Sequence, residues 1–323
     1  MTGQSRATRV TAVPMMLLAG GLIAAQSQIN GRLADELGSG ARAGLAAAVV
    51  SFGSGLLLLT VVVLAVPSAR TGIRRLAGDL RGGQLRPHEV LGGLFGAYLV
   101  ATQGLTVATI GVALFSVAIT AGQASSGLIV DHFGIGPSGH QPFSYPRAVA
   151  AAFAIAAVAL AAGERLVDTF SLQTAAFAVL PLLAGFGTGF QLALNGRLNT
   201  IAGPWATTFN NFLVGTVALV AVFALTLLFE GRLVDPPDTW WLYIGGAMGV
   251  CAIWLAALLA KVHGVLVLGL CMIAGQVICA ELIELLGPSP HVGIVGVVAG
   301  ALTVVGVLVA LLLRPRERRT ANM

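Results

Sequence analysis

Two glutamines occupy matched places inside apolar stretches of this sequence. Gln123 and Gln276 each lie near the middle of an apolar run, and each follows the dipeptide Ala-Gly. A side-chain amide in a hydrocarbon environment is costly unless it is hydrogen-bonded or faces a wet cavity. We therefore expect both glutamines to face a substrate-binding cavity. The alternative is an interhelical hydrogen bond that holds a helix bundle together.

Two further glutamines belong to a motif that occurs twice. The pattern Gln-x-x-x-Asn-Gly-Arg-Leu lies at residues 26–33 and again at residues 191–198. Gln26 and Gln191 are candidates for substrate contact, and helix packing is an equal alternative. The Asn-Gly-Arg triplets are typical of helix ends that stop at glycine and place arginine at a membrane surface. Trp254, inside another apolar run, is a further candidate for the cavity wall.

The acidic residues suggest a way to couple transport to protons. Glu281 and Glu284 are three residues apart toward the end of an apolar run, so their carboxyl groups share one helix face. Neighbouring carboxylates favour retention of one proton, which makes the pair a candidate for proton coupling. The alternative is ordinary solvation at the membrane surface. We expect Asp131, at the end of another run, to be an interfacial residue.

Other kinds of chemistry are not expected. The five histidines are scattered without the spacing of metal ligands, so neither a metal nor another cofactor is predicted. The glycines at residues 185–189 lie within an apolar run with no lysine after them, unlike a nucleotide-binding loop. Cys251, Cys271 and Cys279 also lie in apolar runs and are expected to be small core residues. We predict no catalytic residue.

Composition places these residues in a membrane. Of 323 residues, 57% are hydrophobic and only 10% are charged, whereas a soluble domain has about 25% charged residues. Because lipid offers no partner to the backbone, only helices or a closed barrel can span a membrane. The apolar runs are continuous and roughly 20 residues long, which favours helices over the alternating pattern of barrel strands.

Ten apolar runs are long enough to cross a membrane. They lie at about residues 12–33, 43–66, 89–108, 111–131, 147–163, 176–197, 205–229, 240–260, 264–286 and 291–313. If the N-terminus is cytoplasmic, four cations lie outside, Arg32, Arg42, Arg165 and Arg232, and the other 14 of the 18 lie inside. We therefore expect both termini in the cytoplasm. The Arg-rich segment 67–88 is expected to lie against anionic lipid.

The chain contains an internal repeat. The Gln-x-x-x-Asn-Gly-Arg-Leu motif recurs after 165 residues, and residues 51–55 resemble residues 211–215, an offset of 160. Gly92-Gly93 with Gly96 recurs after 153 residues, and so does Ala121-Gly122-Gln123. Each half has five spans, an odd number, so the second half must enter the membrane from the opposite side. We predict inverted repeats, residues 1–165 and 166–323, with a binding site at their interface.

Together these features resemble the YdcZ-type inner-membrane exporters of the drug/metabolite transporter (DMT) superfamily. The resemblance rests on the five-plus-five duplication, the repeated Gln-x-x-x-Asn-Gly-Arg-Leu motif, the Gly-rich second span, and Gly-Gln followed eight residues later by Asp131-His132-Phe133-Gly134. It implies an α-helical transporter of the bacterial inner membrane with a central cavity lined mainly by spans 1, 3, 4, 6, 8 and 9. The second half departs from the pattern with Glu284-Leu285-Leu286-Gly287.

The expected function is that of a secondary transporter, an exporter of small metabolites or drug-like amphiphiles that works by alternating access. Alternatives are an intramembrane enzyme acting on lipid or prenyl chains, and a membrane accessory protein that transports nothing. The expected partners are a small-molecule substrate and the lipid bilayer, with no nucleic acid. A homodimer through Gly-rich helix faces, such as Gly92 with Gly96 or Gly296 with Gly300, is a further expectation.

Overall fold

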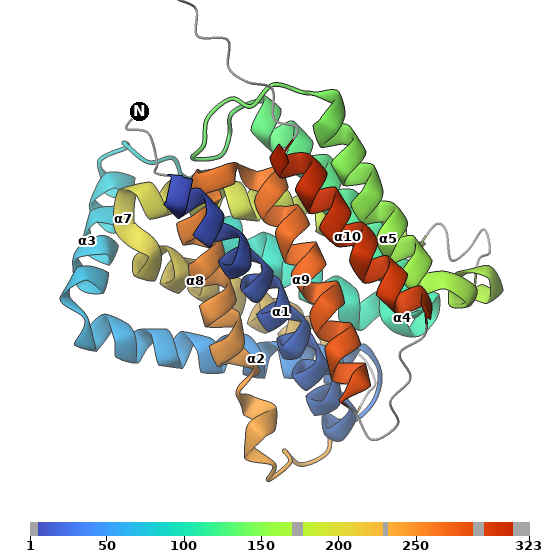
Figure 1. The fold of residues 1–323 in the computed structure, drawn as a ribbon. Helices are drawn as coiled ribbons and strands as arrows, with labels where there is room; N and C mark the ends of the chain where they lie inside the picture. The colour runs from blue at the N-terminus through green and yellow to red at the C-terminus, as the bar shows by residue number, and fades with distance from the viewer. Residues whose placement is uncertain (1–5, 170–176, 229–231, 287–293, 313–323) are drawn as a thin grey trace, which may run out of the picture.

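The computed structural model describes residues 6–169, 177–228, 232–286 and 294–312 (Figure 1). Within these ranges the chain is helical and contains no β-strand, only an isolated bridge between Gly38 and Leu233. The helices are α1 (Arg6–Leu37), α2 (Gly40–Ala65), α3 (Pro67–Arg81), α4 (Gly92–His132), α5 (Tyr145–Thr169), α7 (Val179–Thr226), α8 (Gly245–His263), α9 (Val265–Leu285) and α10 (Ile294–Leu312). Two short 3-10 turns, η1 (Pro87–Val90) and η2 (Trp240–Tyr243), precede α4 and α8.

Helix length and apolarity agree with a membrane protein. Four stretches of the described chain satisfy both criteria for a membrane span: Thr11–Leu37, Gly40–Ala65, Val179–Thr226 and Trp240–His263. Large apolar side chains on their outer faces are exposed, including Leu18, Leu57 and Val217. Such exposure suits contact with lipid tails, which replace water around a membrane-spanning helix. The expected all-helical membrane architecture is therefore confirmed.

α7 consists of two helical arms joined by a kink. Gly203 has φ 79° and ψ 167°, a conformation that residues with a Cβ strongly disfavour, and Pro204 lacks the N–H needed to continue the helix. The hydroxyl group of Thr207 donates to the carbonyl oxygen of Gly203 at 2.9 Å, which ties the first turn of the second arm to the kink. The arms before and after the kink correspond to the apolar runs expected at about 176–197 and 205–229.

α4 also has two arms. The evidence is that both of its ends contact the same part of α7. Phe95 packs against Gly187, and Ser126 packs against Gly189, two residues further along α7. In a straight helix Phe95 and Ser126 would be about 46 Å apart. α4 therefore folds back on itself between these residues. Its arms correspond to the runs expected at about 89–108 and 111–131.

The core lies where the helices cross. One cluster of buried apolar residues joins α1, α8 and α9 and includes Met16, Leu259 and Leu268. A second cluster joins α2 to α7 through the rings of Phe52 and Phe212, whose centroids are 5.1 Å apart. These crossings bring helices from both halves of the chain together, so neither half forms a separate globule.

Candidate functional site

The glutamines of the repeated motif hold neighbouring helices together. Gln191, on the first arm of α7, donates to Asn211 Oδ1 on the second arm at 3.0 Å. Asn195, one turn after Gln191, donates to the same oxygen at 2.9 Å. Gln26 of α1 donates to the hydroxyl oxygen of Ser51 on α2 at 3.3 Å. All these side chains are buried, so each motif forms a polar connection between two consecutive spans.

The other two glutamines have no such partner. Gln123, on the second arm of α4, is 5% exposed and its side chain packs against Gly269 of α9. Gln276 lies on α9 itself and is partly buried. Among the described residues, none forms a hydrogen bond with either side-chain amide. Amides without a partner in the described protein keep both their donor and their acceptor available to a ligand.

Trp254 of α8 contributes a third unpartnered polar group. Its indole Nε1 is buried and has no hydrogen-bond acceptor among the described residues. The indole ring packs against that of Trp205, with centroids 5.3 Å apart, just after the kink of α7. Buried indole N–H groups normally find an acceptor. The pair therefore combines a broad aromatic surface with a free donor, which suits an amphiphilic ligand that carries a polar acceptor.

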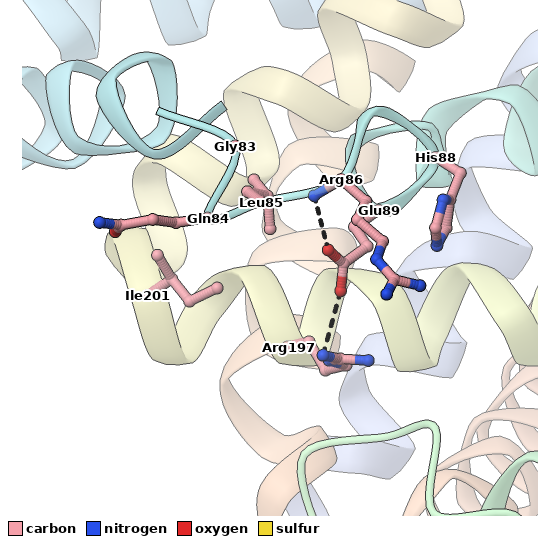
Figure 2. Close-up of a pocket in the computed structure, with 8 residues that line it drawn as sticks. All are labelled: Gly83, Gln84, Leu85, Arg86, His88, Glu89, Arg197 and Ile201. Carbon is pink, nitrogen blue, oxygen red and sulfur yellow. Dashed lines mark hydrogen bonds and ion pairs between the residues drawn. The ribbon is translucent and has the colours of Figure 1, made fainter. Parts of the chain in front are cut away.

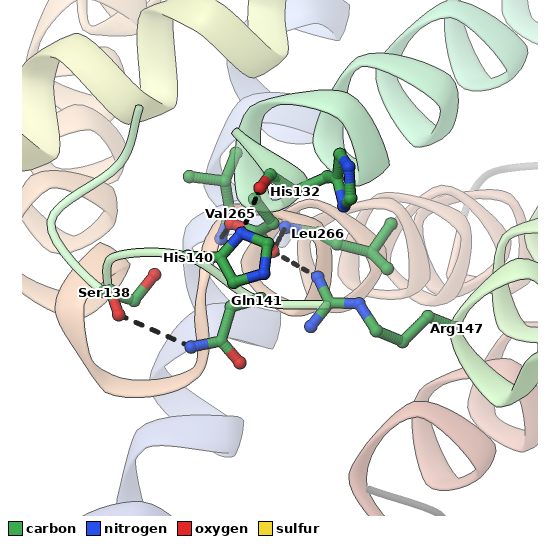
Figure 3. A network of polar contacts seen from close by, with 8 residues as sticks. His132, Ser138, His140, Gln141, Arg147, Val265 and Leu266 are labelled. Atoms are coloured by element: carbon green, nitrogen blue, oxygen red, sulfur yellow. Dashed lines mark hydrogen bonds and ion pairs between the residues drawn. The ribbon is translucent and has the colours of Figure 1, made fainter. Parts of the chain in front are cut away.

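Asp131 joins the end of α4 to the starts of α5 and α9. Figure 3 shows its partners Arg147, Val265 and Leu266 close together. Asp131 is fully buried, and its carboxylate accepts hydrogen bonds from the N–H groups of Val265 at 2.8 Å and Leu266 at 3.0 Å. Val265 begins α9, so its N–H group and that of Leu266 have no partner within the helix, and the carboxylate accepts from both. The positive end of the helix dipole also stabilises the negative charge of the carboxylate. The same carboxylate lies 2.5 Å from the guanidinium of Arg147 near the start of α5.

We call this group of contacts, formed by Asp131, Arg147 and the N–H groups of Val265 and Leu266, the Asp131 clasp. The loop after α4 covers it, since the Gln141 N–H donates to the carbonyl oxygen of Asp131 at 2.7 Å. The sequence predicts an interfacial residue at Asp131, and the structure adds that its side chain is completely buried within the protein. A carboxylate accepting from two backbone N–H groups and an arginine can be buried because its charge is compensated.

The side chains of the two expected proton-coupling residues are not among those that the structure describes. Glu281 and Glu284 belong to the last turns of α9. Their side chains lie outside the described residues, and so do the surroundings of Gly296 and Gly300 on α10. The proton-coupling hypothesis and the α10 dimer face therefore remain predictions.

A surface cavity of about 570 Å³ lies between the α3–α4 connection and α7 (Figure 2). Its lining consists of Gly83, Gln84, Leu85, Arg86, His88, Glu89, Arg197 and Ile201. The guanidinium of Arg197 lies 3.0 Å from Glu89 Oε1, and the backbone N–H of Arg86 donates to Glu89 Oε2 at 2.8 Å. A second cavity of about 260 Å³, mostly apolar, lies between α1 and α8. Gln123, Gln276 and Trp254 line neither of these two cavities.

Two sets of glycine contacts repeat with the offsets found in the sequence. Where α1 crosses α9, Gly20 packs against the backbone of Met272, and Gly275 against that of Leu17. Where the first arm of α7 crosses the second arm of α4, the corresponding pairs are Gly185 with Ile119 and Gly122 with Leu182. Gly245 contacts Asn30 and Gly249 contacts Gln26, and in the same way Gly92 contacts Asn195 and Gly96 contacts Gln191. These glycines therefore allow close approach of helices within one chain.

Comparison with known proteins adds a family and a fold. The sequence model of a family described as "Putative inner membrane exporter, YdcZ" matches residues 11–160 and 176–314. One solved structure, titled "Crystal structure of protein", is 18% identical, covers 97% of this chain and 100% of its own, and superposes with a TM-score of 0.67. At that identity the likeness concerns the fold alone. No curated protein sequence matches the chain.

Proposed function

The chain belongs to the YdcZ family of inner membrane exporters, and we propose that it exports small metabolites or drug-like amphiphiles by alternating access. Membership of an exporter family favours transport over the intramembrane enzyme and the accessory protein. The observation that carries the proposal is that, in the described part of the chain, no residue hydrogen-bonds the side chain of Gln123 or Gln276, whose positions the sequence repeat makes equivalent. A bundle that only needed support would pair these amides, as it pairs Gln26 and Gln191.

Alternating access follows if the two halves are inverted repeats of five spans each. The contacts of α1 with α9 recur between α7 and α4 at the sequence offsets of 165 and 153 residues. An inverted pair can exchange conformations, so that one packing opens toward each side of the membrane. The positive-inside distribution of cations puts both termini, and the Asp131 clasp, on the cytoplasmic side. In this conformation the clasp holds the cytoplasmic ends of α4, α5 and α9 together.

We assign the substrate contacts to three side chains. The amides of Gln123 and Gln276 offer both a donor and an acceptor, and Trp254 offers an indole N–H and an aromatic face. These groups carry no charge, so they suit a neutral or weakly charged amphiphile. Gln26 and Gln191 would support the site from behind by fixing the helices that carry it. Glu281 and Glu284 would supply the proton exchange that drives export.

The test compares two glutamines of different surroundings in the same protein. The protein is reconstituted into proteoliposomes with an imposed proton gradient, and efflux of a fluorescent amphiphile is measured. Gln123→Ala should reduce efflux by about tenfold, the factor that corresponds to one lost hydrogen bond of about 1.4 kcal/mol, with little change in thermal stability. Gln191→Ala should mainly lower thermal stability, because it leaves Asn211 with one partner fewer.

Three results would contradict the proposal. Unchanged efflux by Gln123→Ala, together with a lower melting temperature, would show that Gln123 only supports the bundle. Efflux by the wild-type protein that persists at the same rate after collapse of the proton gradient would exclude Glu281 and Glu284 as coupling residues. Wild-type protein without efflux of any of a panel of neutral and cationic amphiphiles would exclude the proposed substrate class.

A further inference from the structure

α3 lies where a membrane-spanning helix ends. α2 has the length and apolarity of a membrane span and ends at Ala65, and α3 begins at Pro67 after a single residue. Because only one residue separates the two helices, α3 must begin near the lipid headgroups at the end of α2. Figure 1 shows α3 at the edge of the bundle, at a steep angle to α2. α3 therefore lies at the membrane surface rather than in the bundle core.

One face of α3 is fixed against α7. Gly72 packs directly against the backbone of Ala202, and Leu76 is buried. The guanidinium of Arg75 donates to the carbonyl oxygen of Ile201 at 3.3 Å, close to the kink of α7. With this face fixed, the remaining arginines of α3 point outward. Arg70, Arg74 and Arg81 are all exposed, and Arg86 follows on the α3–α4 connection.

The surface cavity of about 570 Å³ follows α3 directly along the chain, because residues 83–86 form part of its lining. Its one carboxylate, Glu89, is already occupied on both oxygens by Arg197 and by the N–H group of Arg86. The Arg86 guanidinium forms no ion pair among the described residues and reaches the cavity, as Figure 2 shows. His88 and the Gln84 amide add further hydrogen-bonding groups. The cavity therefore contains two guanidinium groups and one carboxylate, and Arg197 already balances the charge of that carboxylate.

We propose that this cavity binds the phosphodiester headgroup of an anionic phospholipid from the cytoplasmic leaflet. Guanidinium groups bind phosphate oxygens through paired hydrogen bonds, more specifically than an ammonium group does. Clusters of basic residues directly after a membrane span are attracted to the anionic lipid of that leaflet. A headgroup in this cavity contacts both the α3–α4 connection and Arg197, so it links α3 to the first arm of α7. The lipid thereby becomes a structural part of the cytoplasmic face.

The experiment measures lipid binding to the full-length protein by native mass spectrometry, with phosphatidylglycerol as the anionic probe and phosphatidylcholine as the reference. We expect preferential retention of phosphatidylglycerol by the wild-type protein. Arg86→Gln should weaken phosphatidylglycerol binding about fivefold, the factor that one arginine near an anionic surface contributes. Arg86→Lys, which keeps the charge but not the paired hydrogen bonds, should recover only part of the loss. Arg232→Gln is the matched control, because it removes one exposed positive charge from the segment between α7 and η2, which does not line this cavity.

Three outcomes would overturn the proposal. Equal retention of phosphatidylglycerol and phosphatidylcholine would show that the cavity does not select anionic lipid. An equal loss with Arg232→Gln would mean that net charge alone, and not this cavity, sets the preference. Displacement of bound phosphatidylglycerol by inorganic phosphate at millimolar concentration would identify a soluble anion, rather than a lipid, as the occupant.

Discussion

At the scale of single residues, the buried carboxylate of Asp131 is expected to matter most for stability. Asp131→Asn removes the charge that compensates Arg147, whose side chain is 7% exposed. Removal of one partner from a buried ion pair typically costs about 3–5 kcal/mol, because the other charge stays buried without compensation. We therefore expect a large fall in the melting temperature of the purified protein. Arg197→Gln breaks an ion pair with a 47% exposed side chain and should cost about 1 kcal/mol or less.

The double variant Asp131→Asn/Arg147→Met tests the cause of that loss. Methionine removes the uncompensated charge and fills a similar volume, so the double variant should be more stable than Asp131→Asn alone. Thermal unfolding followed by tryptophan fluorescence measures both. A double variant no more stable than Asp131→Asn would mean that capping of α9, and not the buried arginine, dominates. The described contacts with Val265 and Leu266 would then account for the whole effect.

The same residues show where sequence reasoning succeeds and where it stops. The matched positions of Gln123 and Gln276 are visible in the sequence, and so are the two copies of the motif with Gln26 and Gln191. Which pair is hydrogen-bonded is not visible, because the partners of Gln191 and Gln26 come from other spans. The burial of Asp131 is hidden for the same reason, since Val265 is 134 positions away along the chain.

At the scale of elements, apolar runs predicted the helices well because lipid imposes both length and composition. The joints between helices were less predictable. The sequence Gly203-Pro204 breaks α7, but only the structure shows that the arms stay close enough for Asn195 to reach Asn211. The fold of α4 on itself depends likewise on contacts with α7 rather than on a strong local breaker. Tertiary packing thus decides the joints, whereas hydropathy decides the spans.

The kink of α7 gives a prediction at this scale. A Cβ at residue 203 would meet no atom within 4 Å, so any cost of Gly203→Ala comes from its backbone conformation and not from crowding. We expect a loss of about 1–3 kcal/mol, the usual cost of a residue with a Cβ in this glycine-only region. Gly53→Ala is the matched control, because Gly53 is helical and equally uncrowded. It should be neutral or slightly stabilising. Thermal unfolding of both variants decides, and equal stability would contradict the strain argument.

At the scale of the whole molecule, the proposed exchange of conformations requires that the halves be inverted rather than merely repeated. Two halves in parallel orientation would place equivalent residues on the same side of the membrane. Inverted halves place equivalent residues on opposite sides of the membrane. The crossing of α1 with α9 and that of α7 with α4 would then be alike but lie in opposite orientations relative to the membrane. The matched contacts of Gly20 and Gly185 agree with either arrangement of a repeat. The orientation of equivalent residues relative to the membrane distinguishes the two arrangements.

Arg32 and Arg197 provide that measurement, since both are the arginine of the Gln-x-x-x-Asn-Gly-Arg-Leu motif and both are exposed. Arg32→Cys and Arg197→Cys are made in a background without Cys251, Cys271 and Cys279, and intact cells are treated with a membrane-impermeant maleimide. The Arg32→Cys variant should be labelled from outside. The Arg197→Cys variant should be labelled only after the cells are permeabilised, because we predict a cytoplasmic position for it from the positive-inside distribution. Labelling of both variants from the same side would exclude inverted repeats and, with them, the route to alternating access proposed above.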